Sequence, residues 1–79
     1  MAGKPTKIHS GSNIKKKLGA NIKKSRKILG LSQEELGLRL NADQAYISRL
    51  EAGSLNPTLE SLIEISNALN ISLKTLFTL

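Results

Sequence analysis

Apolar residues recur every three or four positions along most of this chain, in runs separated by polar residues and glycines. This spacing is typical of α-helices that bury one face, because an α-helix completes a turn every 3.6 residues. The first such stripe lies in residues 13–29 and consists of Ile14, Leu18, Ile22 and Leu29. Gly30 then suits the left-handed residue that closes a helix. Gly19 weakens this helix from within, so a start near Gly19 or Ala20 is an alternative.

The second helix opens with side chains that satisfy free backbone amides. Ser32 and Glu35 form a capping box, in which Ser32 accepts from the amide of Glu35 and the glutamate side chain returns to Ser32. Leu36 and Leu40 give this helix its apolar stripe. Asn41 favours the left-handed conformation that ends it.

A third helix is predicted over residues 44–52. Asp43 is suited to cap it, both as a hydrogen-bond acceptor and as a negative charge beside the positive end of the helix dipole. Ile47 and Leu50 point inward, and Gly53 ends the helix.

The remaining chain predicts two more helices. The fourth starts at Thr58 and ends at Asn70, and its expected inner face consists of Leu59, Leu62, Ile65, Ser66 and Leu69. Ser72 caps a short fifth helix that holds Leu73, Leu76 and Phe77. Strand-like alternation is absent, so the predicted fold class is all-α. We expect a single domain of five short helices over residues 13–79, behind a flexible basic arm over residues 1–12.

Positive charge is concentrated in the first third of the chain. Residues 1–27 carry nine lysines and arginines and no acid, whereas residues 28–79 carry three basic and six acidic side chains, which together give the net charge of +6. This asymmetry indicates a polyanionic partner, either nucleic acid or an anionic membrane surface. A lysine-rich face that only keeps the protein soluble is the alternative.

Several classes of function are disfavoured by what the sequence lacks. It has no cysteine and one histidine, His9, which cannot assemble the usual set of metal ligands, so no metal or cofactor is expected. No serine or threonine has a paired base, and no glycine-rich phosphate loop occurs, so we do not expect an enzyme. No apolar run approaches the about 20 residues that span a bilayer. We expect a cytoplasmic protein that binds no membrane and no small-molecule effector.

Three segments carry a resemblance to a known family. They are Leu-Ser-Gln-Glu-Glu-Leu at 31–36, Tyr-Ile-Ser-Arg-Leu-Glu-Ala-Gly at 46–53 and Asn-Pro-Thr-Leu-Glu-Ser-Leu at 56–62. In this order and spacing they resemble the lambda-repressor-like helix-turn-helix family of phage and bacterial transcription regulators, over about residues 18–76. The resemblance implies a compact five-helix domain that binds double-stranded DNA, is usually dimeric and lays its third helix in the major groove.

With Ile47 and Leu50 inward, the opposite face of the third helix holds the candidate base-reading residues, Gln44, Ala45, Ser48 and Arg49. Glutamine can bond adenine N6 and N7, arginine can bond guanine O6 and N7, and alanine can contact the thymine methyl group. The family similarly reads bases from the positions of Gln44, Ala45 and Arg49. The alternatives are a solvent-facing amide at Gln44 that only supports Gln33, and a surface ion pair for Arg49.

Other residues are expected to contact phosphate or to support the third helix. The phosphate candidates are Gln33, Tyr46, Asn56 and Arg39. Similar members of the family place the glutamine that matches Gln33 on a phosphate. The alternative is that Gln33 only helps to start the second helix. The resemblance also implies an ion pair between Arg26 and Glu51 that docks the third helix on the first, with phosphate binding as the alternative for Arg26. Gly37 departs from the family, which commonly has alanine there, and Leu38 is expected to be exposed.

The C-terminus is richer in apolar residues than five short helices need. We therefore expect a homodimer through the fifth helix and the loop before it, with an interface that contains Leu73, Leu76, Phe77 and Leu79. The alternative is that these residues close the core of a monomer. The sequence thus predicts a dimeric regulator on a near-palindromic operator. An antitoxin-type protein-interaction module that also binds DNA is the other function considered, and phage repressors, antitoxins and restriction–modification controllers all stay open.

Overall fold

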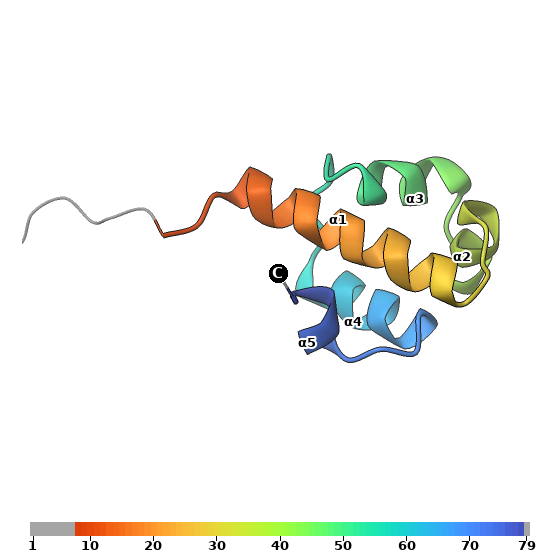
Figure 1. The fold of residues 1–79 in the computed structure, drawn as a ribbon. Helices are drawn as coiled ribbons and strands as arrows, with labels where there is room; N and C mark the ends of the chain where they lie inside the picture. The colour runs from red at the N-terminus through yellow and green to blue at the C-terminus, as the bar shows by residue number, and fades with distance from the viewer. Residues whose placement is uncertain (1–7, 79) are drawn as a thin grey trace, which may run out of the picture.

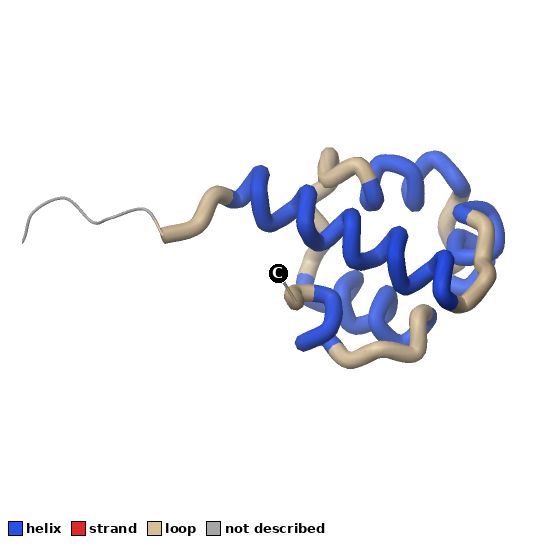
Figure 2. The backbone as a smooth tube through the Cα atoms, in the orientation of Figure 1, coloured by secondary structure: helices blue, strands red, loops and turns tan. Residues whose placement is uncertain are grey.

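The computed structural model describes residues 8–78, and over this range the chain is helical with short connections and no strand (Figures 1 and 2). The helices are α1 (Gly11–Ile28), α2 (Gln33–Arg39), α3 (Gln44–Glu51), α4 (Leu59–Ala68) and α5 (Leu73–Leu76). The predicted all-α fold with five helices is confirmed. None of the described helices is long and apolar enough to cross a membrane.

The predicted start signals of α2 to α5 are present as hydrogen bonds. Ser32 Oγ accepts from the amide of Glu35 at 3.0 Å, and Glu35 Oε1 accepts from the amide of Ser32 at 2.9 Å. The bond from the backbone amide of Ser32 is the main reason that the pKa of Glu35 lies below its usual value. Asp43, Thr58 and Ser72 each accept from the amide three residues on. Each of these helices therefore begins where its own sequence specifies.

The predicted helix ends also adopt the left-handed conformation. Gly30 and Gly53 have φ angles of 70° and 75°, and Asn41 and Asn70 have φ angles of 54° and 55°. The start of α1 differs from the prediction, since this helix begins at Gly11 and passes through Gly19 without a break. A helix start near Gly19 or Ala20 is therefore wrong.

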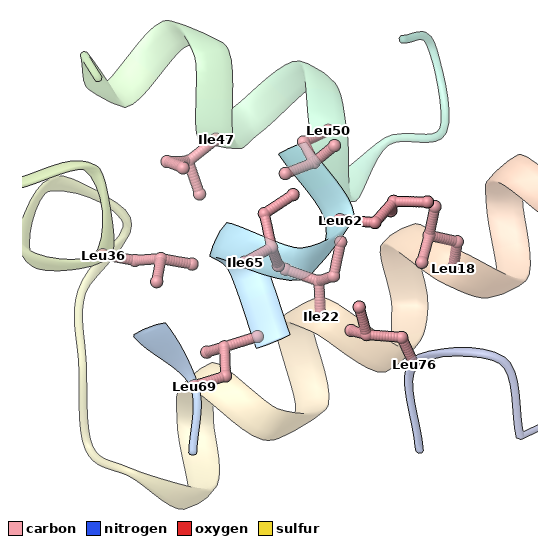
Figure 3. Close-up of a cluster of buried hydrophobic side chains, with 9 residues drawn as sticks. All are labelled: Leu18, Ile22, Leu36, Ile47, Leu50, Leu62, Ile65, Leu69 and Leu76. Carbon is pink, nitrogen blue, oxygen red and sulfur yellow. The ribbon is translucent and has the colours of Figure 1, made fainter. Parts of the chain in front are cut away.

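The core is one apolar cluster at the centre of the five helices (Figure 3). It consists of Leu18, Ile22, Leu36, Ile47, Leu50, Leu62, Ile65, Leu69 and Leu76. Three residues assigned to inner faces lie outside it: Ile14 is only half-buried, Leu29 is 38% exposed and Leu59 is 68% exposed. Ile14 lies in the first turn of α1, Leu29 is the residue that caps the end of α1, and Leu59 is the first residue of α4. Each therefore lies at a helix end, beyond the turns that face the core.

Helix α1 lies between two groups of helices (Figure 1). Helix α3 packs against α1 and α2, whereas α5 packs against α1 and α4. The contact between α1 and α3 is close enough to involve backbone atoms. A Cβ atom at Gly19 would collide with the carbonyl oxygen of Glu51 and lie 2.7 Å from that of Leu50. Glycine at position 19 therefore sets the distance between the two helices.

Gly37 has a similar role within the α2–α3 unit. A Cβ atom there would lie 2.7 Å from the carbonyl oxygen of Ala42, in the turn that leads to α3. The amide of Ala42 also donates to the carbonyl oxygen of Gly37 at 2.8 Å. Gly37, where the family commonly has alanine, thus allows a close contact with the turn before α3. This contact offsets the weak helix propensity of glycine.

Replacing Gly19 by alanine tests the close approach of α1 and α3. Alanine favours an isolated helix by about 1 kcal/mol, but here the added methyl group must push two backbones apart. We expect Gly19→Ala to lower the free energy of unfolding by about 1–3 kcal/mol, measured by urea denaturation with circular dichroism. Gly11→Ala is the matched control in the same helix, because nothing lies within 4 Å of its Cβ position. Equal stability of the two variants would contradict this assignment.

Candidate nucleic-acid interface

The outer face of α3 carries the predicted base-reading residues. Ile47 and Leu50 are buried in the core, which turns the opposite side of the helix outward. Gln44, Ala45, Ser48 and Arg49 are all exposed on that side. These four side chains therefore form one accessible strip of amide, methyl, hydroxyl and guanidinium groups along the helix.

The first residues of α2 and α3 are joined through their side chains. Gln44 Nε2 donates to Gln33 Oε1 at 3.4 Å, and Gln33 Nε2 donates to Glu51 Oε1 at 3.1 Å. Gln33 is half-buried, whereas Gln44 is exposed. The two glutamines thus lie side by side at one end of the strip, and Gln33 is anchored to the end of α3 as well as to its beginning.

Glu51 is the partner of Arg26, which lies in α1. Arg26 Nε donates to Glu51 Oε2 at 2.6 Å and Nη2 donates to Oε1 at 3.0 Å, so the pair is bidentate. Arg26 Nη1 donates to the carbonyl oxygen of Leu31 at 2.7 Å. The hydrogen bond to Glu51 raises the pKa of Arg26 above its ordinary value. With every guanidinium nitrogen donating within the protein, Arg26 holds α1, α3 and the α1–α2 loop together.

Both charges of this pair are shielded from water, since the two side chains are 9% and 4% exposed. Burying charges is expensive unless their hydrogen bonds are complete. Here the requirement is met: among the described residues, no buried side-chain nitrogen or oxygen lacks a hydrogen-bond partner. The intact pair is therefore tolerated in the interior, whereas removing one of the two side chains would leave a buried charge without a partner and destabilise the fold.

The remaining phosphate candidates lie in different surroundings. Asn56 is exposed in the loop before α4, whereas Tyr46 is half-buried and packs against the core. Arg39 Nη1 donates to the carbonyl oxygen of Ala68 at 2.9 Å, at the end of α4. Arg39 thus connects α2 with α4 through one guanidinium nitrogen and is otherwise exposed, and its phosphate contact stays a prediction.

The predicted dimer residues are divided between the core and the surface. Leu76 is completely buried in the core, so its assignment to a subunit interface is wrong: it packs within its own chain. Phe77 is 40% exposed, Leu73 is half-buried against the core, and Leu79 lies outside the described residues. The accessible apolar surface at this end of the chain is therefore smaller than the sequence suggested.

Asn21 is a structural residue that sequence reasoning missed. Its Nδ2 donates to the carbonyl oxygens of Leu76 and Thr78, both at 2.8 Å. These bonds satisfy the end of α5 and fasten it to α1, which explains why Leu76 is held inside. Its position next to the apolar stripe of α1 was a weak signal, because the partner carbonyls lie more than fifty residues away.

Comparison with known proteins gives consistent results. A family profile described as helix-turn-helix matches residues 22–76. The control protein C.MunI from a Mycoplasma species is 39% identical over 67 residues, which cover 84% of this chain and 90% of that protein.

Two solved structures are similar along most of their length. One is the restriction-modification controller protein C.AhdI from Aeromonas hydrophila, with a TM-score of 0.81 and 30% identity over 87% of this chain and 100% of that one. The other is the controller protein C.Esp1396I, solved as a tetramer in complex with its natural 35 base-pair operator. Its TM-score is 0.72, with 38% identity over 81% of this chain and 84% of that one.

Breaking the ion pair from one side tests its role in docking α3. In Arg26→Ala the carboxylate of Glu51 stays buried without its partner, so we expect the free energy of unfolding to fall by about 3–5 kcal/mol. Thermal and urea denaturation measure this loss. Arg49→Ala removes an exposed arginine and should change stability by no more than about 0.5 kcal/mol. A small effect of Arg26→Ala would show that the pair does not hold the helix.

Proposed function

This chain belongs to the helix-turn-helix family of transcriptional regulators, and we propose that it binds a specific DNA operator through the outer face of α3. The observation that carries this proposal is the strip of Gln44, Ala45, Ser48 and Arg49 on a helix whose opposite face is locked in the core. A rigid helix with an accessible polar face is what major-groove readout requires. The family consists of transcriptional regulators and not of enzymes.

The strip has the functional groups for direct readout of base edges. Arg49 is suited to guanine, whose O6 and N7 atoms both accept hydrogen bonds, and Gln44 is suited to adenine. Ala45 is suited to the thymine methyl group, and Ser48 can bond to either kind of base pair. Together these side chains can discriminate several adjacent base pairs.

Phosphate contacts would set the position of α3 in the groove. Gln33 keeps one Nε2 hydrogen free after its bond to Glu51, and Tyr46 and Asn56 flank the strip along the chain. The basic residues of α1 add a sequence-independent attraction to the duplex. In this proposal Gln33, Tyr46 and Asn56 orient α3 on the DNA, and the strip determines the sequence preference.

We expect the functional unit to be a homodimer joined through α5 and the loop before it. Phe77 and Leu73 supply its accessible apolar surface, and we extend the interface to Leu79. A two-fold dimer would place its two recognition helices about 34 Å apart, to match successive major grooves on one side of a near-palindromic operator. The tetramer of C.Esp1396I on its operator is a related example of assembly on DNA.

Arg49→Ala tests direct readout. Selection of duplexes from a random pool should yield a defined site for the unmodified protein. Arg49→Ala should lower the preference at one G·C pair by about 1–3 kcal/mol, whereas Lys23→Ala, in α1, should weaken binding to all sequences alike.

The affinity for the specific site should also fall steeply with salt. Each neutralised phosphate contributes about 0.9 to the slope of the logarithm of the binding constant against the logarithm of the salt concentration. A flat salt response would rule out the phosphate contacts.

Sedimentation analysis tests the dimer. We expect a dimer at tens of micromolar protein, and we expect Phe77→Lys to shift it toward monomer because a charge would enter the apolar interface. Ile8→Lys serves as a control, because Ile8 is an 82% exposed apolar residue far from α5 in the chain. Only monomer in the unmodified protein at this concentration would contradict the dimer.

A further inference from the structure

One oxygen of Glu51 has two partners. Oε1 accepts from Arg26 Nη2 at 3.0 Å and from Gln33 Nε2 at 3.1 Å, while Oε2 accepts from Arg26 Nε at 2.6 Å. The carboxylate is therefore part of the buried ion pair and also reaches the side chains at the edge of the α3 strip. The second contact adds a hydrogen bond to the buried carboxylate and at the same time ties it to Gln33.

The contact with Glu51 determines which way the amide of Gln33 points. A carboxylate only accepts hydrogen bonds, so the amide must turn its NH2 group toward Glu51 and its oxygen away. That oxygen accepts from Gln44 Nε2 at 3.4 Å. The NH2 group of Gln44 must then face Gln33, which leaves the oxygen and the second amide hydrogen of Gln44 free on the exposed face.

The orientation of Gln44 matters for the bases it can accept. Adenine offers a donor at N6 and an acceptor at N7, whereas guanine offers acceptors at both O6 and N7. An amide that is free to turn by 180° exchanges the positions of its donor and its acceptor, so it can also place its NH2 group against other acceptors, such as O6 of guanine. An amide held in one orientation offers a single pattern, so the other bases are rejected at the cost of a broken hydrogen bond.

We infer that Glu51 is a positioning residue for base selection, which acts through Gln33 to fix the side-chain amide of Gln44 in one orientation toward the DNA. The inference rests on the proposed function of α3. Arg26 contributes because its guanidinium keeps its proton at all ordinary pH values and holds the carboxylate in place. The buried pair thus sets sequence preference in addition to docking the helix.

The test uses the full-length protein and begins with the selected operator. The position read by Gln44 is the base pair at which Gln44→Ala loses its preference. Affinities for the four base pairs at that position are then measured by fluorescence anisotropy. We expect the unmodified protein to favour one base pair by at least about fivefold, the lower end for a bidentate contact. In Glu51→Gln the new amide can donate as well as accept, so the preference should fall to within about twofold.

Two further variants separate positioning from stability. Gln33→Met removes the link but keeps the ion pair, so it should lose the preference while its melting temperature stays close to that of the unmodified protein. Arg26→Lys keeps the carboxylate but loses the bidentate geometry, so it should melt earlier and still keep the preference. If Glu51→Gln does not fold, the double variant R26Q/E51Q, which removes both charges together, has the same expected loss of preference.

Distinct results would overturn the inference. It is wrong if Gln33→Met keeps the preference, if Arg26→Lys loses it as fully as Glu51→Gln does, or if Gln44→Ala selects the same sequence as the unmodified protein. In each of these cases the proposed function stands, because Ala45, Ser48 and Arg49 still select a site. If the unmodified protein selects no sequence over unrelated duplex DNA, the proposed function itself has failed.

Discussion

The position of α3 depends on its contact with α1, where two backbones touch and two buried charges meet. Gly19 allows the close approach, and the bidentate pair of Arg26 and Glu51 ties the end of α3 to the last turn of α1. Apolar packing alone would permit small rotations of so short a helix. Directional hydrogen bonds restrict rotation, and their geometry is complete because the third nitrogen of Arg26 is bound as well. The exposed face of α3 is therefore presented in one orientation.

Local features of this fold could be predicted from the sequence far better than its long-range contacts. The capping side chains of α2 to α5 and the left-handed residues Gly30, Asn41, Gly53 and Asn70 depend on neighbours a few positions away. Periodicity also identified most of the core. It failed at Ile14, Leu29 and Leu59, because a stripe does not show which terminal turns of a helix lie beyond the core. The assignment of Leu76 to an interface failed for another reason, because its carbonyl oxygen is bound by the remote Asn21 and its side chain packs in its own core.

The residues of the candidate site could be predicted from the sequence, but the hydrogen bonds between them could not. The outward residues of α3 follow once Ile47 and Leu50 are placed inward, so periodicity and family resemblance suffice for them. Neither indicates that Gln33 bonds to Glu51 or that Arg39 turns toward α4. Both contacts join side chains from different helices, and they require the helices to be positioned first. The network that links the core to the surface is thus visible only in three dimensions.

The attachment of α5 has a consequence for the order in which the molecule can assemble. Helices α2 to α4 each carry their own cap and are joined by short turns, so their contacts can form early, because closing a short loop loses little chain entropy. Helix α5 has four residues and is held by Asn21, which lies 55 positions before Leu76. Its docking on α1 closes a loop of more than fifty residues and requires α1 to be in place. We therefore expect the surface around Phe77 to be completed late in folding, so that an unfinished chain presents α3 before it presents a finished C-terminal surface.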